Sequence, residues 1–220
     1  VVHCYKHLGT WLQQGAKSSK EVVARGTAAR QSWGALHRSL YAKSYVSIKA
    51  KMTAFESLSM SRLMYNCHVW APVTDTMVHA WQNSIRKPLG LFARGHSFGV
   101  SPLLLDVETL CGLLHILPPA DRLHMARLRY LRRLVQVAPN VLWQLLMETK
   151  DKEDSWINAC ERSFDWFRRF YSDHIGLPAD NNLASWLPIV SLDANWFGRV
   201  KAAGAACRRF RQATDRKSTR

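Results

Sequence analysis

Acidic residues are scarce in this sequence, and their scarcity sets its electrostatic character. Asp and Glu number 16 against 31 Lys and Arg, so the formal net charge is +15. Residues 1–110 carry 13 basic and 5 acidic residues, and residues 111–220 carry 18 and 11, so the excess is spread along the chain. A field of this sign attracts phosphate backbones and anionic membrane surfaces. An ordinary basic protein has the same composition, so only motifs can decide between these partners.

Several patterns that identify common protein classes are missing. No run of about 18 apolar residues occurs, so we expect no membrane span and no membrane partner. Neither a GxxxxGKS loop for nucleotide phosphates nor a secretory signal peptide is visible. Because the first residue is Val, we expect the sequence to begin inside a longer protein.

The cysteines and histidines do not form a recognisable metal site. The five Cys residues form no CxxC pair, and their odd number indicates free thiols in a reducing, intracellular compartment, with the nucleus as one candidate. A structural zinc ion needs four ligands. Neither the group of His3, Cys4 and His7 nor the pair of Cys111 and His115 completes such a set. We therefore expect no metal and no cofactor in this chain.

Amphipathic helical sequence is abundant. Hydrophobic residues make up 47% of the chain and include nine Trp, enough to bury a core. Apolar residues recur at steps of three and four, and they predict helices at about 18–41, 47–70, 74–92 (bent or split by Pro88), 102–114, 120–137, 140–150, 154–174 and 193–212. Only residues 1–13 favour strands. The sequence therefore predicts a mainly α protein with a short N-terminal β element, a helical bundle and a second helical lobe.

Two strings carry a resemblance to a known family. The first is Tyr5-Lys6-His7-Leu8-Gly9-Thr10-Trp11-Leu12. The second is spread over 28–70 and contains Ala28-Ala29-Arg30, Trp33, Leu36, Leu40, Ser47-Ile48-Lys49-Ala50-Lys51 and Arg62-Leu63-Met64-Tyr65-Asn66-Cys67-His68-Val69-Trp70. The first resembles the Tyr-Lys-Tyr-Leu-Gly strand that closes the palm of non-LTR retrotransposon (LINE-type) reverse transcriptases. The second is similar to their thumb region, where a Leu-Ser-x-Lys-x-Lys turn precedes a helix ending in Leu-Leu-Tyr-Gly-x-x-x-Trp.

The resemblance covers roughly residues 1–95 and departs from the family at Asn66, where Gly is usual. Asn also tolerates unusual backbone angles, so the departure is compatible with the same turn. The resemblance implies an end-of-palm β element at 1–15, a thumb-like helical bundle at 16–95 and a C-terminal helical basic extension at 96–220. Beyond residue 100 the likeness is limited to a basic, Arg- and Leu-rich helix after the thumb.

The resemblance also implies a function. The chain looks like the non-catalytic C-terminal part of an RNA-directed DNA polymerase, and nucleic acid and the remainder of that polypeptide would be its partners. It would bind template–primer duplex or element RNA. Polymerase chemistry uses carboxylates that hold Mg²⁺, usually an Asp-Asp pair, and this sequence has no such pair. We therefore expect Mg²⁺ only in the preceding palm and no polymerase activity from this chain alone.

Three groups of residues are candidates for nucleic-acid binding. Tyr5, Lys6 and Gly9 resemble the strand near the primer terminus, although a plain hairpin explains them equally well. Lys43, Lys49 and Lys51 bracket a short turn that faces the template–primer backbone in the family, with Arg62 in the following helix. The remaining candidates form a basic stripe on the predicted helix at 120–137, opposite an apolar side, and comprise Arg122, Arg129, Arg132 and Arg133.

Each group also has a structural explanation. Lysines in a turn and arginines opposite an apolar stripe are often only solvated, and most Trp residues occupy apolar helix positions that favour core packing. The segment 166–171, where aromatics and Arg alternate, is the one place that offers both stacking and charge. The alternative function is a helical protein-interaction module, or a domesticated or decayed retroelement remnant, without nucleic-acid binding.

Overall fold

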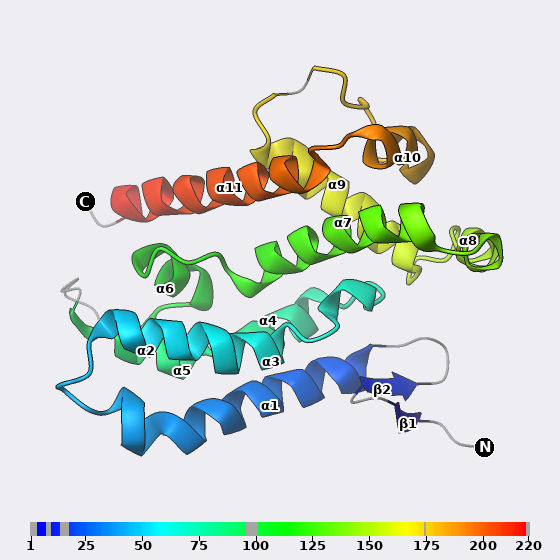
Figure 1. Ribbon diagram of the computed structural model, residues 1–220. Helices are drawn as coiled ribbons and strands as arrows, with labels where there is room; N and C mark the ends of the chain where they lie inside the picture. The colour runs from blue at the N-terminus through cyan, green and yellow to red at the C-terminus, as the bar shows by residue number, and fades with distance from the viewer. Residues whose placement is uncertain (1–3, 8–9, 14–17, 96–100, 174, 219–220) are drawn as a thin grey trace. The chain divides into compact units, whose positions relative to one another are not determined.

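The computed structural model describes residues 4–7, 10–13, 18–95, 101–173 and 175–218 (Figure 1). Nearly all of the regular structure in these residues is helical, which confirms the mainly α fold class. Contacts divide the chain into two compact units. Unit 1 comprises Val1–Tyr65, Thr74–Pro119 and Arg211–Arg220, and unit 2 comprises Asn66–Val73 and Ala120–Phe210. The three-part division that the resemblance implies, 1–15, 16–95 and 96–220, has other boundaries than these two units. It stays a prediction.

Unit 1 begins with two strands and a long helix. Strands β1 (Cys4–His7) and β2 (Thr10–Gln13) pair antiparallel, with Tyr5 opposite Leu12. Helix α1 (Ser19–Leu36) continues into the π-helical segment η2 (His37–Tyr41). A turn then leads into three consecutive helical segments, which are α2 (Ile48–Ala54), η3 (Phe55–Met60) and α3 (Ser61–Leu63). Figure 1 shows this second run alongside α1, and η3 and α3 contact α1.

The rest of unit 1 consists of shorter helices, which are α4 (Asp75–Asn83), α5 (Arg86–Phe92), η5 (Ala93–Gly95), η6 (Pro102–Leu104) and α6 (Val107–Leu113). The predicted helix at 74–92 is split, and Pro88 lies in the first turn of α5, where its missing N–H is tolerated. The side chains of Thr74 and Asp106 cap the helices that follow them, as short polar residues commonly do. Leu63, Ile85 and other apolar side chains are buried.

Unit 2 contains the 3-10 turn η4 (Cys67–Val69) and the helices α8 (Asn140–Glu148), α9 (Trp156–Phe170) and α10 (Leu183–Leu192). It also contains α7 (Pro119–Val137) except its first residue, and α11 (Trp196–Ser218) up to Phe210. Asn66 precedes η4 with φ 54°, which is in the left-handed region that Asn tolerates better than most residues. Helix α10 is absent from the sequence prediction. The predicted helices at 120–137, 140–150, 154–174 and 193–212 correspond to α7, α8, α9 and α11.

Aromatic residues form much of the core of unit 2. Phe164 stacks on Trp186 with ring centroids 4.4 Å apart, and Phe167 lies 5.2 Å from Trp196. The indole Nε1 of Trp196 donates a hydrogen bond to the main-chain oxygen of Leu128, 2.9 Å away. The fully buried Trp residues therefore pack within the fold, as their apolar helix positions predict.

Candidate nucleic-acid interface

The fold concentrates the positive charge in unit 1. Its residues include 17 Lys and Arg against 6 Asp and Glu, whereas unit 2 has 14 against 10. The net charges are therefore +11 and +4, although the two halves of the linear sequence differ by only one charge. A field of this strength over one compact unit favours an anionic partner there.

Three of the six acidic residues of unit 1 are engaged in its own structure. Glu21 is 1% exposed and forms an ion pair with Arg25. Asp106 accepts a hydrogen bond from the main-chain nitrogen of Thr109 at 2.8 Å. Glu108 forms an ion pair with Arg211. Residues 22–55 contain no acidic residue, so Lys43 and Lys49 have no carboxylate within six residues of them in the sequence.

The turn between η2 and α2 is held at both ends. At its start, the main-chain nitrogen of Ala42 donates to the oxygen of His37 at 2.8 Å. The ring of Tyr41 is buried and lies 5.6 Å from that of Phe92. At its end, the Ser47 hydroxyl oxygen accepts a hydrogen bond from the main-chain nitrogen of Ala50 at 3.2 Å and so caps α2. The backbone of the turn is thereby fixed on both sides.

The predicted lysines lie in this turn or just after it, with Lys49 and Lys51 in α2. Lys43 and Lys49 are exposed, Lys51 is half-buried, and Arg62 is exposed on α3. Within the described part of the chain, none of these four side chains makes a hydrogen bond or an ion pair. They are free to contact an external phosphate group.

The other predicted residues in unit 1 lie at its N-terminus. Tyr5 and Lys6 belong to β1, but their side chains are outside the described part of the structure. Gly9 lies outside the described residues. These three residues therefore stay a prediction from the sequence resemblance alone.

The four arginines of the predicted stripe on α7 differ in their solvent exposure. Arg129 and Arg133 are exposed and Arg122 is half-buried. Arg132 is only 9% exposed, and its guanidinium donates hydrogen bonds to the main-chain oxygens of Val190 and Ser191. These oxygens belong to the last turn of α10, whose carbonyls have no partner within the helix. Arg132 thus caps α10 and is not part of an exposed stripe.

Sequence reasoning missed a second buried arginine on α7. Arg127 is 4% exposed, and its Nη2 donates a hydrogen bond to the main-chain oxygen of Trp70 at 3.1 Å. Burial lowers the pKa of Arg127. Its position halfway between Leu123 and Leu131, at steps of four, is the signal that places it on the apolar side of the helix.

The groups around Arg127 are held in their neutral forms. Burial raises the pKa of the Cys67 thiol to about 12, although Arg127 opposes this shift. Burial likewise raises the pKa of Cys160. Burial, with Arg127 and Arg169 nearby, lowers the pKa of His124 to about 3. Because a nucleophilic cysteine requires the thiolate, these thiols belong to the core.

The aromatic and basic segment 166–171 also faces inward in part. Trp166 is 6% exposed and Phe167 is fully buried. The Trp166 indole donates a hydrogen bond to the Asp121 carboxylate. The two aromatic side chains are therefore engaged in the core of unit 2, which leaves Arg169 as the exposed basic residue of the segment.

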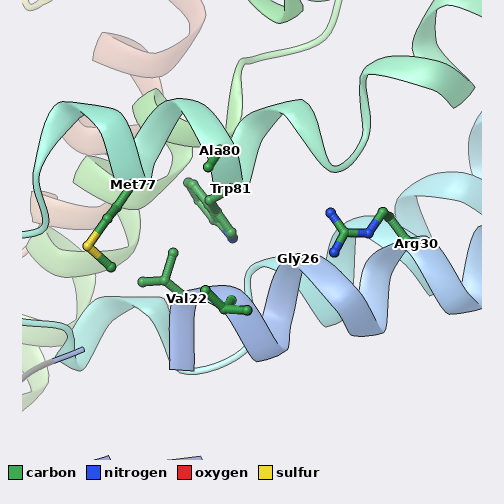
Figure 2. Close-up of a pocket in the computed structure, with 7 residues that line it drawn as sticks. Val22, Gly26, Arg30, Met77, Ala80 and Trp81 are labelled. Carbon is green, nitrogen blue, oxygen red and sulfur yellow. The ribbon is translucent and has the colours of Figure 1, made fainter. Parts of the chain in front are cut away.

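A pocket of about 230 Å³ lies between α1 and α4. Figure 2 shows residues that line it. Its lining residues are Val22, Val23, Gly26, Arg30, Met77, Ala80 and Trp81. A Cβ atom on Gly26 would lie 3.3 Å from the Cβ of Ser84, so the glycine allows close approach there. The pocket is smaller than the roughly 300–1,000 Å³ of typical small-molecule sites. The pocket is lined mostly by apolar side chains, with Arg30 as its basic residue, so we do not assign the nucleic-acid interface to it.

Comparison of the chain with protein-family models, with curated proteins and with solved structures gives no match. Among the described residues, no group of three or more His, Cys, Asp or Glu side chains is placed to hold a metal ion. No helix in the described part of the chain is long and apolar enough to cross a bilayer.

Proposed function

We propose that this chain binds nucleic acid through its phosphate backbone, as the non-catalytic C-terminal part of a retrotransposon-type RNA-directed DNA polymerase. The ligand is template–primer duplex or element RNA. The observation that carries the proposal is the high net charge of unit 1, together with the side chains of Lys43, Lys49 and Lys51, which make no hydrogen bond or ion pair within the described residues. The same lysines belong to the string that resembles the family's thumb.

The geometry favours backbone contact over base readout. Lysine is a point charge on a flexible stem, and contacts from such side chains position a nucleic acid without reading its sequence. Lys43 lies in the turn, and Lys49 and Lys51 lie among the first four residues of α2, so the three charges are close together in the sequence near one helix start. Binding should therefore depend on salt and hardly on base sequence.

The test measures the affinity of the chain for a fluorescent RNA–DNA hybrid duplex across a series of salt concentrations. Replacing Lys43, Lys49 and Lys51 with Ala should weaken binding. It should also flatten the plot of log affinity against log salt by up to about 2.7 units, about 0.9 for each lost phosphate contact. Surface substitutions usually change stability within about 0.5 kcal/mol, so the circular dichroism spectrum should be preserved.

A matched control uses three exposed lysines of unit 2. The variant with Lys150, Lys152 and Lys201 replaced by Ala removes the same charge, so it separates a local contact from a general effect of net charge. Its salt dependence should stay close to that of the wild type. Equal changes in the two triple variants would overturn the assignment of the interface to the turn. A double variant of Arg129 and Arg133 tests the exposed basic residues of α7 separately.

The exposed surface of α8 favours the second candidate function, a protein-interaction module. No residue of α8 is buried, and Val141 is 64% and Leu145 57% exposed. Val137, at the end of α7, is 78% exposed. Exposed apolar groups of this kind often mark interaction sites. If neither the lysine nor the arginine variants change affinity or salt dependence, the basic surfaces only solvate the fold and the interaction module is the better assignment.

A further inference from the structure

The turn between η2 and α2, residues 42–47, is called the basic turn from here on. It also presents an aromatic ring to solvent. Tyr45 is 82% exposed, the highest exposure of any aromatic residue in the described part of the chain. It lies between Lys43 and Lys49, which are also exposed. Within the described residues, the ring makes no aromatic contact and its hydroxyl makes no hydrogen bond. The resemblance to the family's thumb points to the lysines near this turn and not to Tyr45.

The other exposed aromatic residues differ from Tyr45 in their surroundings. Tyr65 is 43% exposed, and the Arg25 guanidinium lies over its ring at 4.4 Å from the centroid. Phe210 is 62% exposed and lies 5.8 Å from Phe170. Phe197, 42% exposed, is in unit 2, where the net charge is lower. Tyr45 is thus the exposed aromatic residue in the acid-free basic segment whose ring is not already in contact with another group.

Contacts on both sides of Tyr45 fix the backbone that carries its ring. Tyr41, four residues earlier, is buried against Phe92, and Ser47, two residues later, caps α2. Tyr45 therefore extends from a backbone that is fixed on both sides. An exposed aromatic side chain between cations matches the combination by which proteins bind single strands, where bases stack on rings and cations follow the backbone.

We propose that Tyr45 is a stacking platform that directs the basic turn toward nucleic acid with unpaired bases. The inference rests on the proposed function and makes it more specific. A base in a duplex has both faces covered by its neighbours, whereas a base in a single strand, a loop or a primer end can leave the stack and lie on the tyrosine ring. Lys43 and Lys49 then hold the flanking phosphates.

Three fluorescent probes test this proposal, namely a mixed-sequence single-stranded DNA, an abasic strand of the same length and charge, and an RNA–DNA hybrid duplex. Tyr45→Ala should weaken binding of the intact single strand by about 5- to 150-fold, the loss typical for one stacked base. Binding of the abasic strand and of the duplex should not change. Tyr45→Phe keeps the ring and should bind like the wild type. The salt dependence should be unchanged, since no charge is removed.

Phe197→Ala is the control for removing an exposed ring elsewhere, and it should leave all three affinities unchanged. If Tyr45→Ala binds the intact strand as tightly as the wild type does, or loses the same factor on all three probes, the stacking proposal is overturned. The lysine triple variant distinguishes this failure from failure of the proposed function. If that variant loses affinity while Tyr45→Ala does not, only the stacking proposal fails. If the chain binds none of the probes, both proposals fail.

Discussion

The indole Nε1 of Trp166 donates a hydrogen bond to Oδ1 of Asp121, and the two atoms are 2.9 Å apart. Trp166 is 6% exposed and Asp121 3%, so the bond lies in the interior of unit 2 and joins α9 to α7. In the sequence, Asp121 stands out as the one acidic residue near the arginines of α7, and Trp166 as a possible stacking surface. The structure pairs them with each other.

Trp166→Phe should therefore destabilise the protein. The substitution keeps a large apolar side chain but removes the donor to a buried carboxylate. A hydrogen bond to a charged group contributes about 1.5–3 kcal/mol, so a loss of this size is expected in the free energy of unfolding, measured in urea. Trp143→Phe is the control, because the half-buried Trp143 makes no hydrogen bond through its indole in the described part of the chain. Equal losses in both variants would argue against a stabilising role for the bond.

Arg132 should behave as a structural residue, unlike its neighbours on α7. Arg132→Met leaves the carbonyl oxygens of Val190 and Ser191 without their donor, and such loss costs about 1–3 kcal/mol. Replacing the exposed Arg129 and Arg133 with Ala should change the unfolding free energy by no more than about 0.5 kcal/mol. Chemical denaturation of the two variants tests the contrast. A stable Arg132→Met protein would show that α10 does not need this cap.

Gly34→Ala should stabilise the protein. Gly34 lies in the last turn of α1, is exposed, and a Cβ atom there would meet no atom within 4 Å. Alanine favours the helix by about 0.5–1 kcal/mol over glycine, and nothing opposes the gain. Gly26→Ala is the comparison, because its Cβ would lie 3.3 Å from that of Ser84 and the neighbour must yield. Thermal unfolding should show a higher midpoint for Gly34→Ala than for the wild type, and a smaller or reversed shift for Gly26→Ala.

His124 should make stability depend on pH. Its pKa of about 3 in the folded protein lies below the usual value of about 6.5 in an unfolded chain. Between these values the unfolded chain binds a proton that the folded protein does not. The contribution is therefore complete above about pH 6.5 and is lost as the pH falls toward 3, by at most about 1.4 kcal/mol per pH unit.

Urea unfolding at several pH values tests this contribution against the His124→Gln variant. Glutamine stays neutral and can still bond the Ser163 hydroxyl, which lies 3.1 Å from Nδ1 of His124. Groups such as His68, whose pKa burial and Arg133 also lower, titrate in both proteins and cancel in the difference. The variant should lose less stability than the wild type between pH 7 and pH 5. The same pH dependence in both proteins would contradict a neutral, buried His124.

Helix α10 is an element that the local sequence pattern did not predict. It contains Pro188, whose missing N–H weakens the helix, and no strong amphipathic pattern predicts it. Glu161 of α9 accepts a hydrogen bond from the Leu183 main-chain nitrogen at its start, and Arg132 of α7 binds the carbonyls at its end. Both contacts come from residues far away in the sequence and add to the local cap by the Asn182 side chain, so tertiary contacts help to stabilise a helix that its internal proline weakens.

The sequence by itself determined the helical class and the leucine-rich apolar side of α7, because these depend on side-chain spacing within a few residues. Only the tertiary structure decided which arginines of α7 are free, since Arg127 and Arg132 are buried by contacts with Trp70 and α10. It also gathered most of the net charge in unit 1 and left Tyr45 exposed within it. Burial and electrostatic potential depend on residues brought together from distant parts of the chain, and no local pattern records them.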